Sequence, residues 1–507
     1  MKTYHTIKTL ALGGIAMFSL ASCSLDYEPL SEPSEITQGG QTETSTAVLK
    51  DKAAADAQLK SLYELFRNRQ EHTHLDYLLI GDSHSDNAYA GTTGAEVVPY
   101  ETNSIDASNS VLSRDWNRYL EDIAQANVLI NGVEQLKENG QISEAEYHSY
   151  KAQGEIFRAL MMFRMARLWG SFPVITTIAK TITSDNINEV YPTYYPPRKT
   201  PKECYEQIIA DLTDAEQYAP DNDNSDRTKM TKTVAQAMLA KVYAEKEVQD
   251  YDKVIAYADK VMNTTGVELE DSYETLWGYD ETAIDCMKRN TKEGILEVHW
   301  SGGGNWETWM YGRQLDNWDY YFTWAKWITP SRDIINDFDK EGDEVRKNQA
   351  IVYYACTWSN YYPASNYPFM YKLRSSYNNI YWVRLADIIL MKAEAEAYKG
   401  NLAESAKLVN QIRKRAKLKE LTSDKTGSKE AMIEAVLHER RLELAFEGER
   451  WFDLCRNNKV EKYLNGIDSR DSGRIRQVKQ FDSNSYLLPI PQTALDQNTN
   501  LEQNPGY

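Results

Sequence analysis

The sequence predicts a mainly α-helical protein, and three observations support this prediction. Apolar residues recur at helical spacing in blocks along most of the chain. Several blocks come in pairs joined by short turns, which is typical of tetratricopeptide repeats. A long stretch without helical period, residues 267–381, separates the last blocks from the others. We therefore expect degenerate helix pairs that wrap around an irregular, loop-rich region with a few short strands.

The helical blocks fall into three groups along the chain. Ile156, Leu160 and Phe163 show the apolar spacing, and Gly154 and Ala159 allow a neighbouring helix to approach closely. Segments 240–262 and 390–416 are each predicted to form two helices with a turn between them. The predicted helices are Ala53–Arg69, Arg114–Glu138 and Glu144–Trp169, then Lys202–Tyr218, Thr231–Glu247 and Asp252–Asn263, and finally Val383–Lys399, Leu402–Ala416 and Lys429–Arg456.

The stretch from 267 to 381 is too long for a linker inside a helical protein, so we expect it to form the ligand-binding elaboration. It contains a predicted strand at Gly294–Trp300 and a short predicted helix at Ser331–Asp339. The helical repeats would then lie mainly in residues 51–266 and 383–456.

The N-terminus has the features of an export signal. Lys2 and Lys8 precede an apolar run, Leu10–Ala21, that is too short to span a bilayer. Leu20-Ala21-Ser22-Cys23 follows the bacterial lipobox pattern, so we expect residues 1–22 to be removed and Cys23 to be lipidated. The alternative is an ordinary signal with an incidental cysteine. Residues 23–50 are polar and rich in Ser, Thr and Pro, which predicts a flexible tether before the domain at 51–507.

The composition restricts the possible ligands. A formal net charge of −18 argues against nucleic acid, whose phosphates require a basic surface. The chain holds 34 Tyr and 12 Trp against only 11 Phe. Rings with a polar group suit half-exposed recognition surfaces.

The best candidate for ligand contact is Trp300–Trp327, which contains six of the 12 tryptophans. A flat ring can cover the C–H face of a sugar while polar side chains bind its hydroxyls. The alternative is an aromatic core buried under a loop. The predicted contact residues are the rings Trp306, Trp309, Trp318, Tyr321 and Trp324, with the polar Asn305, Arg313, Asp316, Asn317 and Asp319.

A second candidate is the loop Gly81–Gly91, in which Asp86, Asn87 and Tyr89 could bind hydroxyls. The alternative is a loop whose Asp and Asn side chains bond to its own backbone. His72, His74, Asp76 and His84 suggest a metal site, but their spacing is not diagnostic and we predict no metal and no cofactor. We expect the charged residues between Glu439 and Arg450 to form an ion-paired or solvated helix face rather than a ligand site.

Five segments in this order resemble the SusD/RagB family. The most specific is ERRLELAFEGERWFDLCR, an acidic and basic helix that runs into Gly-Glu-Arg-Trp-Phe-Asp-Leu. The segments are GEIFRALMMFRMARLWGSFPVI (154–175), TPSRDIINDFDKEGDEVRK (329–347), YWVRLADIILMKAEAEAYKG (381–400), ERRLELAFEGERWFDLCR (439–456) and YLLPIPQTALDQNTNLEQNPGY (486–507).

This resemblance implies a SusD-like fold with four tetratricopeptide units. It also implies a surface-exposed outer-membrane lipoprotein of Bacteroidota that binds a glycan, or sometimes a peptide, and delivers it without catalysis to a SusC-like TonB-dependent transporter. Two alternatives remain open. One is a surface glycosidase, which would need two carboxylates facing one sugar. The other is a helical-repeat lipoprotein that binds only peptides or proteins.

Overall fold

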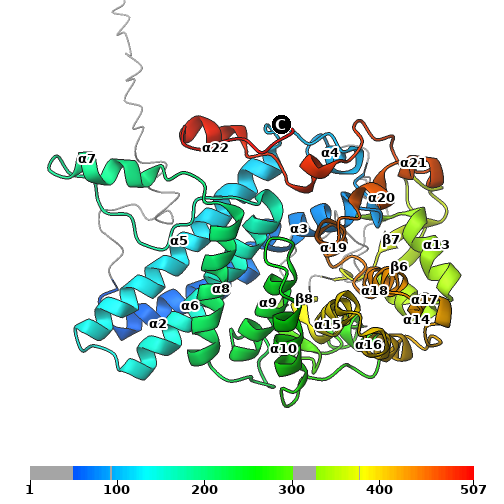
Figure 1. Ribbon diagram of the computed structural model, residues 1–507, viewed down its shortest axis with the longest axis horizontal. Helices are drawn as coiled ribbons and strands as arrows, with labels where there is room; N and C mark the ends of the chain where they lie inside the picture. The colour runs from blue at the N-terminus through cyan, green and yellow to red at the C-terminus, as the bar shows by residue number, and fades with distance from the viewer. Residues whose placement is uncertain (1–48, 92–93, 301–326, 376) are drawn as a thin grey trace, which may run out of the picture.

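The structure is a computed structural model that describes residues 49–91, 94–300, 327–375 and 377–507. Within these residues, long helices form an elongated body, with the N-terminal helices toward one end and the C-terminal ones toward the other (Figure 1). The long helices are α2 (Lys52–Asn68), α5 (Ser110–Glu138), α6 (Glu144–Trp169), α8 (Pro201–Tyr218), α9 (Lys232–Ala244), α10 (Tyr251–Met262), α15 (Leu385–Lys399), α16 (Leu402–Arg415) and α18 (Lys429–Glu443).

Among the described elements, long helices that follow one another in the order of the chain, with only short elements between them, also pack side by side. In the described residues α5 contacts α6, α8 contacts α9, α10 contacts α15, and α16 contacts α18. Contacts between α6 and α8, α9 and α10, and α15 and α16 join these four successive pairs into one array. The prediction of a mainly helical fold with four degenerate helix pairs is confirmed.

Local signals fix several helix ends close to their predicted positions. The Ser143 hydroxyl accepts a hydrogen bond from the Glu146 backbone N–H, and the Glu146 carboxylate accepts one from the Ser143 N–H, so α6 begins with a capping box. At the other end of the array, α15 stops at Gly400, whose φ of 83° places it in the left-handed region that favours glycine.

Two predicted helix boundaries are wrong. Val383 belongs to strand β8 (Asn379–Arg384), and α15 starts only after it. The predicted helix Lys429–Arg456 is broken between α18 and α19 (Arg450–Arg456). The chain turns there through the positive φ angles of Phe446 and Gly448, and the Asp82 carboxylate accepts hydrogen bonds from both backbone N–H groups. A long-range contact therefore overrides the helical pattern.

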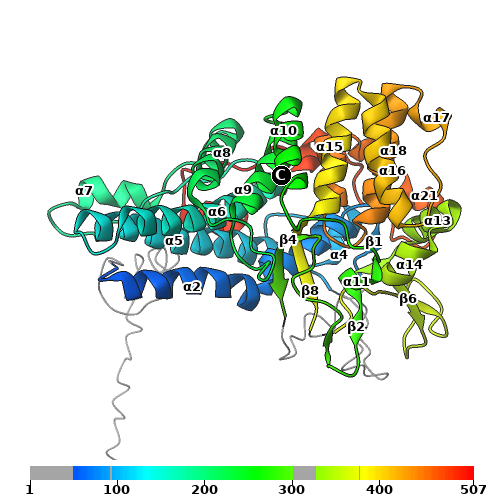
Figure 2. The same ribbon diagram turned by 90° about the horizontal axis from the view of Figure 1, so that it is seen from below.

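The described strands lie together on one side of the helical array, below it in Figure 2. The predicted strand at Gly294–Trp300 is β4 (Gly294–His299), which pairs antiparallel with β8, and the predicted short helix is α13 (Arg332–Glu341). The other strands form antiparallel pairs: β1 (Ala88–Tyr89) with β5 (Thr329–Pro330), β2 (Tyr279–Asp280) with β3 (Asp285–Cys286), and β6 (Ile351–Tyr354) with β7 (Tyr367–Met370).

Short helices fill the connections between these elements. Of the helices in the described ranges, none combines the length and apolar character needed to cross a bilayer. The short helices are α3 (Asp76–Leu78), α4 (Val98–Thr102), α7 (Ile187–Val190), α11 (Glu274–Trp277), α14 (Glu344–Ala350), α17 (Ser423–Thr426), α20 (Val460–Leu464), α21 (Ile467–Arg470) and α22 (Gln492–Gln497), with π-helical turns at Glu71–Leu75 and Leu79–Ser83 and 3₁₀ turns at Tyr191–Tyr194 and Ser483–Tyr486.

Candidate ligand-binding site

The two segments predicted to bind ligand, Gly81–Gly91 and Trp300–Trp327, meet where the second one ends. Strand β1 in the first segment pairs with β5, which begins two residues after Trp327. The Ser83 hydroxyl also donates a hydrogen bond of 3.0 Å to the backbone oxygen of Trp327. The structure thus brings together two regions that lie more than 200 residues apart in sequence.

Most predicted contact residues lie in the span 301–326, outside the described residues. Their role in ligand binding stays a prediction. These residues are Asn305, Trp306, Trp309, Arg313, Asp316, Asn317, Trp318, Asp319, Tyr321 and Trp324.

Asp86 and Asn87 are buried and bonded inside the chain. The Asp86 carboxylate accepts hydrogen bonds of 2.8 and 2.9 Å from the Arg450 guanidinium. Burial alone would raise the pKa of Asp86, but Arg441 and Arg450 lower it below its ordinary value. The Asn87 amide accepts a hydrogen bond from Arg441 at 2.9 Å and donates one to Asp82 at 2.8 Å.

Tyr89 is also buried, with its ring stacked on Tyr361 at 4.3 Å between centroids. Its hydroxyl donates to Asp471 at 2.6 Å and accepts from the Arg332 backbone N–H at 3.0 Å. The placement of Asp86, Asn87 and Tyr89 disagrees with the prediction of a hydroxyl-binding loop, because their polar atoms already have partners within the chain. The three residues hold the loop against the C-terminal helices.

The histidines near this loop have separate contacts. His72 Nε2 lies 2.8 Å from a carboxylate oxygen of Asp122, and His84 Nδ1 lies 2.6 Å from the Tyr100 carbonyl oxygen. The half-buried His74 ring meets Trp300 edge-on, 5.7 Å between centroids. Across the described parts of the chain, no three His, Cys, Asp or Glu side chains are grouped so that they could hold a metal ion.

A solvent-facing cleft of about 520 Å³ lies between α2 and β4, beside the point where the chain enters the tryptophan-rich span. Because it borders the tryptophan-rich span, we take this cleft as the part of the candidate site that lies within the described residues. It has both aromatic and charged walls. The cleft is lined by Asp56, Leu59, Lys60, Tyr63, Glu64, Phe66, Arg67, Thr228, Glu297, Val298 and His299.

The charged groups on the α2 side of the cleft remain largely exposed. Asp56 is 55% exposed, and its hydrogen bonds from Tyr150 and Lys52 lower its pKa, so it is an ionised acceptor at neutral pH. Glu64 is 44% exposed and lies 3.7 Å from Lys60. Arg67 has no charged partner among the described residues. These groups can therefore exchange water for a polar ligand.

The β4 side of the cleft is held rigidly by Glu297. This buried carboxylate accepts hydrogen bonds from the backbone N–H groups of Asn290 and Thr291 and from the Asn379 amide. It also accepts a hydrogen bond from the Thr291 hydroxyl at 2.7 Å and lies 2.8 Å from His299 Nε2. The tautomer with hydrogen on Nε2 donates to Glu297, which orients the ring and makes Nδ1 an acceptor.

Comparisons with known proteins identify the chain's relatives. A family model described as the SusD family matches residues 274–507, and a second, described as starch-binding associating with outer membrane, matches residues 41–244. The chain belongs to the SusD/RagB family. SusD-like protein P2 of Formosa agariphila is 27% identical over 441 residues, which cover 79% of this chain and 81% of that relative.

Solved structures of SusD-like proteins share the fold. A surface glycan-binding protein A from Bacteroides fluxus superimposes with a TM-score of 0.72 at 21% identity, covering 90% of this chain and 99% of that one. A laminarin-binding SusD-like protein gives a TM-score of 0.67 at 22% identity, covering 90% and 100%. At these identities the likeness concerns the fold.

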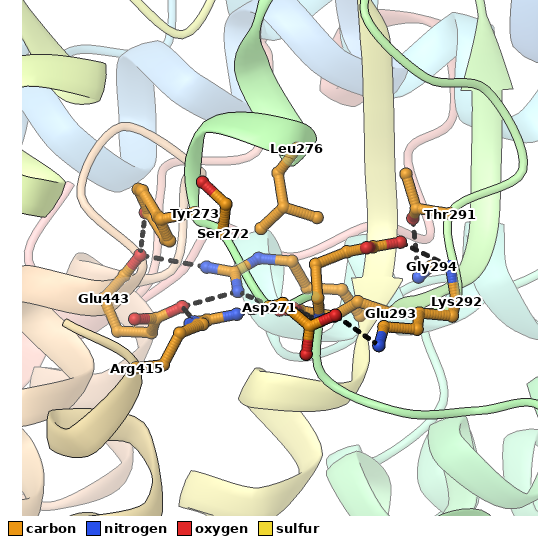
Figure 3. Close-up of polar contacts among 12 residues, drawn as sticks. Asp271, Ser272, Tyr273, Leu276, Thr291, Lys292, Glu293, Gly294, Arg415 and Glu443 are labelled. Atoms are coloured by element: carbon orange, nitrogen blue, oxygen red, sulfur yellow. Dashed lines mark hydrogen bonds and ion pairs between the residues drawn. The ribbon is translucent and has the colours of Figure 1, made fainter.

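The most specific SusD/RagB signature, residues 439–456, lies in the interior. Arg384 of β8 donates hydrogen bonds to Glu443 at 2.6 Å and to Glu293 at 2.7 Å, and its other nitrogens bind Glu447. Arg415 of α16 bridges Glu293 and Glu443, and the Tyr273 hydroxyl donates to the Glu443 carbonyl oxygen (Figure 3). The sequence predicted an ion-paired or solvated helix face at these residues. The structure shows an ion-paired face, and this face is buried.

This ion cluster joins segments that are distant in the chain. It ties β8, α16 and α18 to the loop before β4, with Glu293 and Arg415 drawn in Figure 3 between these elements. Because its members are buried and already bonded, the cluster is structural. Periodicity alone could not place it, since charged residues at helical spacing usually face solvent.

Proposed function

We propose that this protein binds a neutral glycan at the cell surface and passes it to a SusC-like TonB-dependent transporter. The observation that carries the proposal is the cleft between α2 and β4. Its half-buried Leu59 and Tyr63 side chains give apolar surface, and its exposed Asp56 and Glu64 give acceptors. A sugar has an apolar C–H face and donates hydrogen bonds through its hydroxyls, so these walls suit it.

The tryptophan-rich span beside the cleft supports the same ligand class. The chain leaves β4 through His299, a cleft residue, and continues into residues 301–326 with their dense Trp and Tyr. We infer that rings from this span extend the cleft into a longer sugar-binding surface. The proteins similar in fold include one named for binding laminarin and one for binding surface glycans, which agrees with this ligand class.

The charge of the cleft favours a neutral glycan over an acidic one. Asp56, Glu64 and Glu297 line it against Lys60 and Arg67, and the whole chain carries a formal net charge of −18. A polyanion would meet unfavourable potential there. We propose no catalytic step.

Delivery to a transporter requires a position at the outer membrane. We propose that Cys23 is acylated after removal of residues 1–22 and anchors the chain at the surface. Metabolic labelling with a fatty-acid analogue should label the wild-type protein and leave Cys23→Ser unlabelled. Equal labelling of both would contradict the anchor.

Retardation in polyacrylamide gels containing polysaccharide tests the binding function. We expect laminarin or starch to slow the mature chain, and a pectic or alginate gel to leave it unaffected. His299→Ala should weaken retention, because it removes an oriented acceptor, and Trp309→Ala and Trp318→Ala should weaken it as well. Glu134→Ala, an exposed change on α5 outside the cleft, is the matched control.

Three outcomes would each contradict part of this proposal. Retention that survives all three changes would place the site elsewhere. Release of reducing ends from the polysaccharide would show a glycosidase and contradict a binding function. Retention by alginate and not by laminarin would contradict the proposed neutral ligand.

A further inference from the structure

A second cavity, of about 270 Å³, lies between α5 and the segment that follows α6. Figure 1 shows α7, part of this segment, standing beside α5 at one end of the body. The wall is mostly aliphatic. The lining residues are Leu120, Ile123, Ala124, Asn127 and Val128 of α5, with Ile175, Thr177, Ile178, Ala179, Lys180, Glu189, Val190, Thr193 and Tyr194 of the segment.

Two polar side chains of this wall, Asn127 and Tyr194, already have partners. The Asn127 amide donates to the Ile175 carbonyl oxygen at 2.9 Å and accepts from Arg158 at 2.8 Å. The Tyr194 hydroxyl donates to the Lys180 carbonyl oxygen at 2.7 Å. The cavity therefore offers a sugar few hydrogen bonds, and its occupant should be apolar.

The described chain begins right beside this cavity. Leu49 is buried against Gly132 of α5, where even a Cβ atom would come within 2.5 Å of the leucine side chain. Gly132 follows the lining residue Val128 by one turn of the helix. The residues before Leu49 thus start from the α5 surface that borders the cavity.

Residues 24–47, which precede this point, include a short apolar set. Leu25, Tyr27 and Leu30 alternate with acidic residues, whereas the part from 37 to 46 is almost entirely polar. From Leu49 back to Leu30 the chain can span up to roughly 60 Å when extended. The α5 axis from Gly132 to Leu120 measures only about 18 Å. The apolar set can therefore reach every part of the cavity.

We propose that the cavity binds the N-terminal segment of its own chain through Leu25, Tyr27 and Leu30. These side chains enter the aliphatic space, while Asp26 and Glu28 stay outside near Lys180. Lys180 and Glu189 are 76% and 80% exposed and 4.0 Å apart, so their mutual pairing is weak and Lys180 can turn to another carboxylate. Because the segment is covalently attached, a weak intrinsic affinity is sufficient.

Docking of this segment would fix the orientation of the protein relative to the membrane. Leu25 lies two residues from Cys23, so an anchor at Cys23 would hold the end of the body that carries α5 and α7 close to the lipid surface. The docking itself depends on neither glycan binding nor acylation.

Amide hydrogen exchange on the full mature chain tests the proposal. In the wild type, peptides covering residues 24–36 should exchange at least about tenfold more slowly than the same peptide free in solution. Ala124→Trp fills the cavity and should abolish this protection. Leu25→Ser/Tyr27→Ser/Leu30→Ser should abolish it too, and should speed exchange in the cavity wall at 175–194.

The matched control is Gln135→Trp, an exposed change on the same helix outside the cavity, which should keep the protection. Thermal unfolding followed by circular dichroism checks that every variant folds. Exchange of residues 24–36 at the free-peptide rate in the wild type would overturn the proposal. So would protection that persists in Ala124→Trp, or a wall at 175–194 that is insensitive to the triple substitution. Glycan retention should be unchanged in all variants, which separates this result from the proposed function.

Discussion

Arg384 and Arg67 carry the same guanidinium group in opposite surroundings. Arg384 is 1% exposed and bonds to Glu293, Glu443 and Glu447. Arg67 is exposed at the cleft, and the described residues offer it no carboxylate. A buried charge with several partners is required by the fold, whereas an exposed charge without one remains available to a ligand. The two regions should therefore respond to mutation in different measurements.

The largest expected effect is on the interior cluster. Arg384→Met removes a cationic partner from the buried carboxylates of Glu293 and Glu443, which should lower the free energy of unfolding by about 3–5 kcal/mol. Arg67→Met should change it by less than about 0.5 kcal/mol. Urea unfolding measures both. Equal urea midpoints for the two variants would remove the distinction between the regions.

A substitution of Asp86 tests whether this residue, which the sequence predicted to bind ligand, instead stabilises the interior. Asp86→Asn keeps the shape but removes the charge that Arg441 and Arg450 face, so the free energy of unfolding should fall by about 2–3 kcal/mol. Glycan retention measured well below the unfolding temperature should persist. Lost retention at unchanged stability would restore the ligand-binding interpretation.

His74 makes the free energy of unfolding depend on pH. Burial, with a further contribution from nearby Arg164, lowers its pKa to about 3 from an ordinary value of 6.5. The folded state therefore keeps the ring neutral while the unfolded chain takes up a proton below pH 6.5. This contribution to stability is complete above pH 6.5 and is lost as the pH falls toward 3, by about 2 kcal/mol at pH 5.

His74→Phe should flatten this part of the pH profile. Urea midpoints of the wild type and the variant, measured between pH 8 and 5, give the comparison. The variant should lose less stability than the wild type on acidification. Parallel profiles would show that His74 is not the group responsible.

The smallest effect on stability is expected in the cleft. The Glu64 side chain is 44% exposed and, among the described residues, pairs only with Lys60 at 3.7 Å, so Glu64→Gln should change the free energy of unfolding by less than about 0.5 kcal/mol. If a sugar hydroxyl donates to this carboxylate, glycan affinity should fall about threefold to tenfold. Isothermal titration with laminarin measures it, and unchanged affinity would exclude Glu64 from the contact.

Much of the fold follows from local signals in the sequence. The apolar spacing predicted α5, α6, α8 and α16 with nearly their observed bounds, because caps such as Ser143 and Thr200 act within a few residues. The break between α18 and α19 escaped prediction because Asp82, more than 350 residues away, bonds the backbone there. Strand β8 was missed for a similar reason: its partner is β4.

The candidate site was less accessible from sequence. The polar loop Gly81–Gly91 looked exposed, yet Asp86 and Asn87 pair with arginines from the far end of the chain. The α2–β4 cleft combines a helix from the N-terminal part with a strand some 230 residues later, and no local pattern marks such a meeting. What could have directed attention to it is His299, which directly precedes the tryptophan-rich span.

The strand pairs on either side of residues 301–326 have an evolutionary consequence. The chain enters this span from β4, fixed by β8, and returns from it into β5, fixed by β1. Insertions or exchanges between these two anchor points leave both ladders intact. If the proposed contact residues in this span bind the glycan, a change of ligand preference would require replacement of this one segment and would leave the helical scaffold unchanged.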